Sequence, residues 1–321
     1  MLVPVLLFLV GLVLLIKGGD WFVDGASGIA HHFHIPELLI GATVVSIGTT
    51  LPEVMVSATS AVSGHGEIAY GNAIGSIICN TSLIAALTVA IKPSKVDRKS
   101  LRIPVIFFFV AAVFYSFIAY KFQNFSRLTG FILLAMFLIY MTVTVIQAKK
   151  NPQTSQETNA EDEKYSMGKD LILLIVGAAL IAVGANLLVN NGTLIAQAVG
   201  VPESVIALTF VALGTSLPEL VTAITSLIKG HGALSLGNII GANLFNLVLV
   251  SGVSTVLAPF AIPQSKVIAG MNASLVVDIP VMFGVMLLLT VPALIREKLS
   301  RVQGILLLLV YAGFCFFQFA L

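Results

Sequence analysis

Ten stretches of about 20 or more mainly apolar residues follow one another along this chain, and they restrict its possible folds severely. An apolar helix of about 20 residues spans the roughly 30 Å hydrocarbon core of a bilayer. Charged residues make up only 10% of the 321 residues, against roughly a quarter in soluble proteins. The sequence therefore predicts an all-α, polytopic membrane protein. The ten predicted spans are residues 2–29, 36–62, 67–91, 101–120, 125–148, 168–199, 203–228, 233–258, 274–295 and 302–320.

A polar segment divides these spans into two groups of five. Residues 149–167 hold the densest run of charge and are predicted to form a cytoplasmic linker between a first half, 1–148, and a second half, 168–321. Thirteen lysines and arginines fall in the odd-numbered loops and three in the even-numbered loops. Because cytoplasmic loops carry the excess of Lys and Arg, both termini are expected to be extracellular, in a multi-pass protein of the plasma or inner membrane. The N-terminal apolar run has no preceding positive charge, so it is interpreted as a retained first helix.

The two halves contain copies of one sequence. Residues 11–80 align without a gap on 177–246, and 26 of the 70 positions are identical. Each unit contains five spans, an odd number, so the second copy is predicted to cross the membrane in the opposite direction. Inverted repeats with interrupted helices are typical of secondary transporters, whose binding site lies near the middle of the membrane where the repeats meet.

A proline followed by a glutamate lies near the centre of the second span and again near the centre of the seventh. These pairs are Pro52-Glu53 and Pro218-Glu219. An ionisable residue at that depth costs at least about 2.5 kcal/mol on insertion scales, which marks it as functional by default. Proline removes a backbone donor, so the sequence predicts that helices 2 and 7 are broken there and that their free carbonyls line a cavity.

Oxygen-bearing side chains surround the two glutamates in the sequence. They are Thr49, Thr50, Ser76 and Asn80 in the first repeat and Thr215, Ser216 and Asn246 in the second. Carboxylate, amide and hydroxyl oxygens suit calcium, magnesium or alkali cations, whereas zinc and copper prefer histidine and thiolate ligands. Taken singly, each proline fits a simple kink and each Thr or Asn a helix–helix hydrogen bond. The symmetric pair of mid-membrane glutamates favours an ion site instead.

Four segments carry a resemblance to a known family. GTTLPE (48–53), GNAIGSIICN (71–80), GTSLPE (214–219) and GNIIGANLFN (237–246) resemble the alpha-repeats of the sodium/calcium exchanger family, in its compact prokaryotic form. The resemblance extends over the whole ten-span layout. It implies a secondary antiporter, not an enzyme, that exchanges sodium for calcium by alternating access, with spans 1 and 6 sliding against the core. No cofactor beyond the transported ions and no obligatory protein partner are expected, and the net charge of +2 is too small to suggest a nucleic-acid partner.

The family's ligands carry over by motif. Glu53 and Glu219 resemble the central carboxylates that hold calcium. The remaining implied ligands are Thr49 and Thr215 at the calcium site, Thr50, Ser216 and Ser76 for sodium, Asn80 and its counterpart Asn246 in the middle, and the backbone carbonyls of Ser46 and Ala212. Two positions depart from the family: Ala242 replaces a common serine, and Asn246 replaces a common aspartate. These departures weigh against potassium dependence and leave the sodium stoichiometry open.

Several alternatives remain open at this stage. Proton-coupled calcium exchange is the nearest, because two glutamates can also titrate. A channel would share the inverted repeats, and an intramembrane hydrolase would need a nucleophile with a paired base. Asp20 and Asp24, late in the first span, are expected to be solvated near the interface or to gate the cytoplasmic mouth, and His231 is expected to serve a turn.

Overall fold

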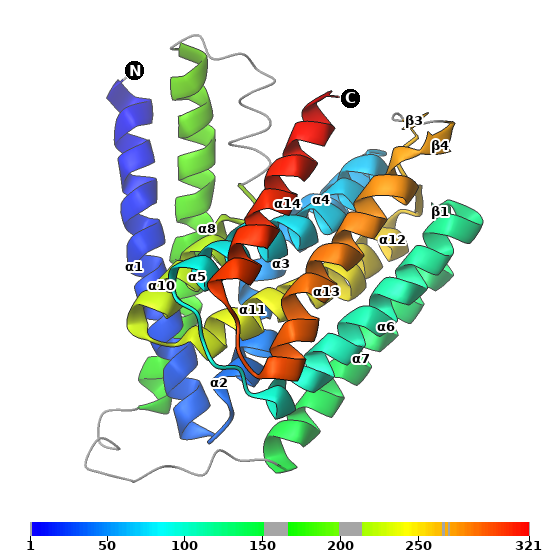
Figure 1. The fold of residues 1–321 in the computed structure, drawn as a ribbon. Helices are drawn as coiled ribbons and strands as arrows, with labels where there is room; N and C mark the ends of the chain where they lie inside the picture. The colour runs from blue at the N-terminus through cyan, green and yellow to red at the C-terminus, as the bar shows by residue number, and fades with distance from the viewer. Residues whose placement is uncertain (1, 151–165, 199–213, 265–266, 269, 321) are drawn as a thin grey trace.

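Figure 1 shows the computed structural model, which describes residues 2–150, 166–198, 214–264, 267–268 and 270–320. The helices of the first half are α1 (Leu2–His32), α2 (Glu37–Ile40), α3 (Ser46–Val62), α4 (Gly66–Cys79), α5 (Ala86–Ile91), α6 (Arg98–Phe122) and α7 (Arg127–Lys150). Those of the second half are α8 (Met167–Ala198), α10 (Leu217–Lys229), α11 (Gly232–Phe245), α12 (Ser251–Leu257), α13 (Ile279–Arg296) and α14 (Arg301–Ala320).

Short π-helical segments and strands complete the fold. The π-helical segments are η1 (Gly41–Val45), η2 (Asn80–Ala85), η5 (Asn246–Val250) and η6 (Ser274–Asp278). The strands are β1 (Asn124–Phe125), β2 (Phe260–Ala261), β3 (Val267–Ile268) and β4 (Met271–Asn272), paired antiparallel as β1 with β2 and β3 with β4. Each π-helical segment continues directly into an α-helix, so these irregular turns lie inside membrane-spanning segments.

The prediction of an all-α membrane protein is confirmed. Nine helical segments in the described part of the chain are long and apolar enough to cross a membrane, and they match nine of the ten predicted spans. The remaining predicted span, 203–228, is described only from Gly214 onward, where α10 begins at Leu217. Most of the predicted linker, residues 151–165, lies outside the described residues.

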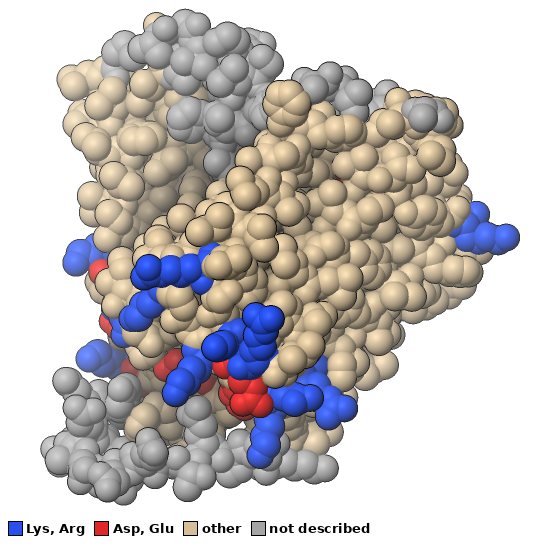
Figure 2. Space-filling model, viewed as in Figure 1, with Lys and Arg blue, Asp and Glu red and all other residues tan. Residues whose placement is uncertain are grey.

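Connections that are distant in sequence pair at the same end of the bundle. The amide of Val96 donates to the carbonyl of Glu297 at 2.9 Å, which joins the loop before α6 to the loop before α14. At the other end, β1 follows α6 and pairs with β2, which follows α12. Figure 1 places both chain ends at one end of the bundle, and Figure 2 shows most of the visible Lys and Arg side chains toward the opposite end.

Two segments form the centre of the molecule, and α1 with α8 stands beside it. Gly66–Ile91 and Gly232–Leu257 are the most deeply buried of the spanning segments. The α1–α8 pair lies at one side of the bundle in Figure 1 and packs antiparallel through small residues. A Cβ placed on Gly177 would lie 2.5 Å from the backbone nitrogen of Phe22, so the two backbones are nearly in contact there.

Candidate functional site

The two glutamates meet in the interior. Glu53 lies in α3 and Glu219 in the first turn of α10, and both side chains are fully buried. Their carboxylates are close enough for their charges to repel one another. The carboxylate of Glu219 also faces the hydroxyl groups of Thr49 and Thr50 from the first repeat. The structure therefore brings both acidic side chains of the internal repeat into a single polar centre.

The predicted break at Pro52 is wrong, and the region of Pro218 is described only from Gly214 onward. Helix α3 continues through Pro52, and the irregular part of this span is the π-helical segment η1, which ends one residue before Ser46. Proline interrupts the hydrogen-bond ladder but keeps helical φ, so the neighbouring turns hold the helix together. In the second half, Pro218 lies in the first turn of α10, where its missing N–H leaves no intrahelical bond unmade.

Many buried oxygens around the glutamates lack a hydrogen-bond partner of ordinary geometry among the described residues. They are both carboxylate oxygens of Glu53 and of Glu219, the hydroxyls of Thr50 and Ser216, and the amide oxygens of Asn80 and Asn246. Leaving a buried acceptor unsatisfied costs about 1–3 kcal/mol, and more for a charged group. A cation coordinated by these oxygens would satisfy them and offset the repulsion between the two carboxylates.

The asparagines at the centre sit at the starts of π-helical segments. Asn80 begins η2 and Asn246 begins η5, and both side chains are fully buried. The Nδ2 of Asn246 donates to the carbonyl of Ala242 at 3.1 Å, which leaves its Oδ1 without a partner among the described groups. Ser76 is buried one turn before Asn80. Single π turns occur often at functional sites, and nothing in the sequence pattern indicated these.

Two further asparagines contact the predicted ligands. The hydroxyl of Thr49 donates to Oδ1 of Asn238 at 3.1 Å, and the hydroxyl of Thr215 donates to Oδ1 of Asn72 at 3.3 Å. Neither Asn72 nor Asn238 is among the ligands predicted from the sequence. The signal was present, because Gly-Asn occurs at matching positions in both repeats.

The backbone positions of the predicted site are described only in part. Ser46 is fully buried at the start of α3, and its hydroxyl donates to the carbonyls of Gly41 at 2.7 Å and Asn238 at 2.9 Å. Its counterpart Ala212 lies outside the described residues.

Helices α1 and α8 cover one side of the site. A cavity of about 10 Å³ separates Thr49, Pro52 and Pro218 from Phe22 of α1 and Ala178 of α8. That volume holds about one water molecule. Phe22 is almost completely buried and lies against Gly48, at the start of the GTTLPE motif. Helices α1 and α8 therefore lie directly against the GTTLPE motif at this point.

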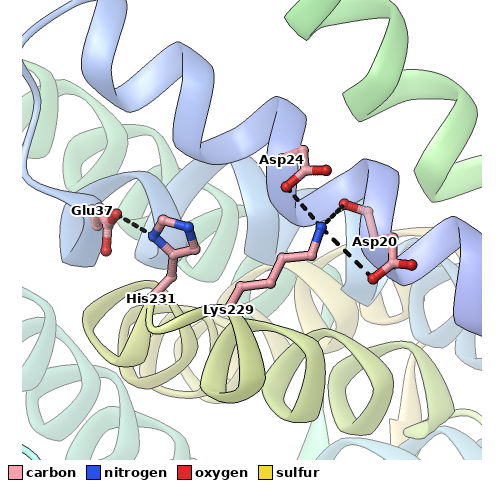
Figure 3. Close-up of polar contacts among 5 residues, drawn as sticks. All are labelled: Asp20, Asp24, Glu37, Lys229 and His231. Atoms are coloured by element: carbon pink, nitrogen blue, oxygen red, sulfur yellow. Dashed lines mark hydrogen bonds and ion pairs between the residues drawn. The ribbon is translucent and has the colours of Figure 1, made fainter. Parts of the chain in front are cut away.

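Charged contacts tie α1 and α2 to the region where α10 ends and α11 begins, as Figure 3 shows. The ammonium of Lys229 lies 2.7 Å from a carboxylate oxygen of Asp24 and 3.6 Å from one of Asp20. His231 Nδ1 lies 2.6 Å from Oε1 of Glu37. Asp20 and Asp24 are thus ion-paired as well as partly exposed, and His231 does more than form a turn.

The His231–Glu37 contact makes stability depend on pH. The pKa of His231 is raised, chiefly by its hydrogen bond to Glu37 and also by the negative charges of Glu37 and Asp24. Partial burial and the positive charge of Lys229 lower this pKa but do not cancel the increase. A pKa raised above the unfolded value of about 6.5 contributes stability that is complete below that value and is lost as pH rises through the folded-state pKa. We expect up to about 1 kcal/mol from this half-buried pair.

Thermal unfolding in detergent at pH 6 and pH 9 checks this expectation. The unfolding midpoint of the parent should fall more between the two pH values than that of Glu37→Gln. Glu67→Gln, an exposed carboxylate just after the matching turn of the first repeat, is the control and should follow the parent. Parallel pH dependence in the parent and Glu37→Gln would contradict the assignment.

Comparison with known proteins identifies the family. The family model described as sodium/calcium exchanger protein matches residues 3–146 and 169–320. The chain is 34% identical over 265 residues to the inner membrane protein YrbG of Escherichia coli, covering 81% of each chain. It is 29% identical over 349 residues to the sodium/calcium exchanger MaX1 of Methanosarcina acetivorans, covering 96% of each.

A solved structure agrees over nearly the whole length. The sodium-calcium exchanger NCX_Mj, soaked with 2.5 mM Na⁺ and 10 mM Sr²⁺, is 34% identical and superposes with a TM-score of 0.82, covering 97% of both chains. The residues that the family model matches include Glu53 and Glu219. The family consists of membrane transporters and not of enzymes. This chain is a multi-pass integral membrane protein that belongs to the sodium/calcium exchanger family.

Proposed function

We propose that this protein exchanges sodium for calcium across the membrane by alternating access at a single site between Glu53 and Glu219. One observation carries the proposal: two fully buried carboxylates, one from each sequence repeat, lie close enough to repel one another, and their oxygens lack hydrogen-bond partners of ordinary geometry among the described residues. Calcium offsets both charges, and sodium ions can replace it only by using the same oxygens. Since one set of carboxylates serves both ions, calcium and sodium are carried in alternate half-cycles.

The proposed ligands follow the implied assignment. Glu53 and Glu219 hold calcium centrally, with oxygen added by Thr49 and Thr215. The flanking and middle sodium ligands are Thr50, Ser216, Ser76, Asn80 and Asn246, with the backbone carbonyls of Ser46 and Ala212 as outer coordination points. Two carboxylates and neutral oxygens suit a hard cation and give no preferred place to a transition metal.

The proposed architecture is a ten-helix inverted repeat, residues 1–148 and 168–321, with both termini extracellular. It is supported by the gapless alignment of the repeats and by the odd-numbered loops that pair at one end of the bundle. The basic residues gathered toward the end opposite the termini support a cytoplasmic location for that end (Figure 2). The name of the Escherichia coli relative supports an inner-membrane location.

The proposed movement is a slide of α1 and α8 as one unit. Their tight packing at Gly18 and Gly177 favours joint movement. Their side of the cavity beside the site is formed by Phe22 of α1 and by Ala178, Ile181 and Ala182 of α8. The ion pairs of Lys229 with Asp20 and Asp24 hold one end of α1 against α10 in this conformation. These contacts must break or shift when α1 slides.

Sodium coupling is tested by calcium uptake into proteoliposomes loaded with sodium. We expect uptake to fall to background when an impermeant cation replaces internal sodium at fixed pH, because protons alone would not displace calcium from the site. An inside-positive voltage should accelerate uptake, since the family implies that more sodium charge leaves than calcium charge enters. The relatives named as sodium/calcium exchangers favour this outcome.

Two other outcomes would point elsewhere. Uptake that persists without sodium and follows an imposed pH gradient would favour proton-coupled calcium exchange. This alternative is considered because Asn246 replaces an aspartate that is common in the sodium/calcium exchangers. Calcium flux that needs no counter-ion would indicate a channel. Strict counter-transport at a slow turnover is the result that the antiporter proposal requires.

A further inference from the structure

We propose that Asn72 and Asn238 are positioning residues for the cation site, a role that rests on the proposed function. Each asparagine accepts the hydroxyl hydrogen of a threonine from the opposite repeat, Thr215 for Asn72 and Thr49 for Asn238. Each threonine precedes its glutamate by one helical turn. The two contacts join matching positions of the internal repeats, so the same threonine–asparagine hydrogen bond occurs twice around the polar centre.

The amide of Asn72 is held in one orientation by its neighbours. Its Nδ2 donates to the hydroxyl of Ser57 at 2.8 Å and to the carbonyl of Glu53 at 3.3 Å. A carbonyl oxygen only accepts, so this contact requires the NH₂ group to face α3. The Oδ1 of Asn72 therefore faces Thr215 as an acceptor, and the threonine must supply the hydrogen.

Asn238 repeats this contact with less support. It is fully buried, its Oδ1 accepts from Thr49, and its backbone carbonyl accepts from Ser46 at 2.9 Å. Ala223 stands where the first repeat has Ser57, and the Nδ2 of Asn238 has no partner among the described groups. The Thr49 hydroxyl is thus the described side-chain contact of this amide, in the same arrangement that Thr215 makes with Asn72.

The direction of the hydroxyl hydrogen decides whether threonine oxygen can bind a cation. A hydroxyl coordinates a cation through its lone pairs, so its hydrogen must point away. Without Asn238, the hydrogen of Thr49 has two other acceptors in reach: the carbonyl of Ser46, at 3.5 Å, and the carboxylate of Glu219. Both are proposed ligands, so a hydrogen bond to either would compete with the cation. Asn238 removes that competition.

A double-mutant cycle on calcium binding tests the role directly. Calcium Kd would be measured by titration calorimetry on the full-length parent, Asn72→Leu, Thr215→Val and the double variant, and in parallel on Asn238→Leu with Thr49→Val. Each single variant should weaken binding about three- to tenfold, the range expected for one buried hydrogen bond. Within each contacting pair, the double variant should be no weaker than the worse single variant.

The crossed pairs are the matched control. Asn72→Leu with Thr49→Val, and Asn238→Leu with Thr215→Val, break two separate contacts, so their effects on Kd should multiply. Thr49→Ser and Thr215→Ser keep the hydroxyl and should retain most of the parent affinity. If the asparagines had a purely structural role, their replacement would lower the unfolding temperature. The effects on Kd would then not depend on which asparagine is combined with which threonine, and the serine variants would not retain the parent affinity. If a leucine variant fails to fold, Asn→Ala at the same position removes the acceptor with a smaller side chain.

The outcomes separate this role from the function on which it rests. Multiplicative effects in the contacting pairs, or parent-like Kd values in both asparagine variants, would overturn the positioning role while leaving calcium binding by the parent intact. A parent that binds no calcium would overturn the proposed function itself, and the positioning role with it.

Discussion

Replacing either buried glutamate by glutamine is expected to abolish sodium-dependent calcium uptake. Glu53→Gln and Glu219→Gln each remove one of the two negative charges at the centre and keep the shape of the side chain. Because calcium affinity depends strongly on the charge of its ligands, we expect a loss of at least about 100-fold in uptake by proteoliposomes. The two variants should be equally affected, since the site takes one carboxylate from each repeat.

The matched control is Glu67→Gln. Glu67 is an exposed carboxylate in the first turn of α4, whereas Glu53 and Glu219 are fully buried. Its replacement by glutamine should leave uptake unchanged. Both glutamine variants should remain folded, because a neutral amide is easier to bury than a carboxylate that repels its neighbour. Full uptake by either variant, with protein levels equal to the parent, would remove the site assignment.

Adding one methyl group between α1 and α8 is the second change with a large expected effect. In Gly177→Ala the new Cβ would lie 2.5 Å from the nitrogen of Phe22 and 2.8 Å from the carbonyl of Gly18, both backbone atoms. Backbone cannot move aside as a side chain does, so the helices must separate. We expect a destabilisation of about 1–3 kcal/mol and loss of most calcium uptake, since α1 and α8 would no longer move as one unit.

Gly284→Ala is the control for this change. Gly284 is also helical, in α13, but nothing lies within 4 Å of its added Cβ, so alanine should be tolerated or stabilise the helix by up to about 1 kcal/mol. The single tryptophan of the chain, Trp21, precedes Phe22 in α1 and supplies an intrinsic fluorescence signal for the melting curves of both variants. Equal melting curves and equal uptake in the two variants would contradict the proposed rigid pair.

Much of the fold was predictable because the bilayer imposes a simple rule on sequence. Spans of apolar residues predicted nine of the described helical segments, and the repeated Pro-Glu pairs pointed to the buried centre. The places where the helix within a span is broken or irregular were not predictable in the same way. Proline at position 52 suggested a broken helix, yet α3 continues through it, because the loss of one ladder bond does not end a helix whose inner face is buried in the bundle.

The fine structure of the site depends on contacts between distant segments. The π-helical segments that begin at Asn80 and Asn246 lie buried in the centre, and hydrophobic periodicity does not mark them. The roles of Asn72 and Asn238 depend on threonines in the opposite repeat, 143 and 189 residues away in sequence. Their Gly-Asn motifs were visible, but only the folded chain shows which hydroxyl each amide accepts.

The central claim is that one cation is held jointly by Glu53 and Glu219 in the middle of the membrane. An anomalous difference map from crystals soaked in Sr²⁺, a calcium substitute, tests it most directly. The claim predicts a strong peak that bridges the carboxylates of both glutamates and is absent in crystals of Glu53→Gln. A map with no peak between them, or with the two carboxylates on separate surfaces, would contradict it.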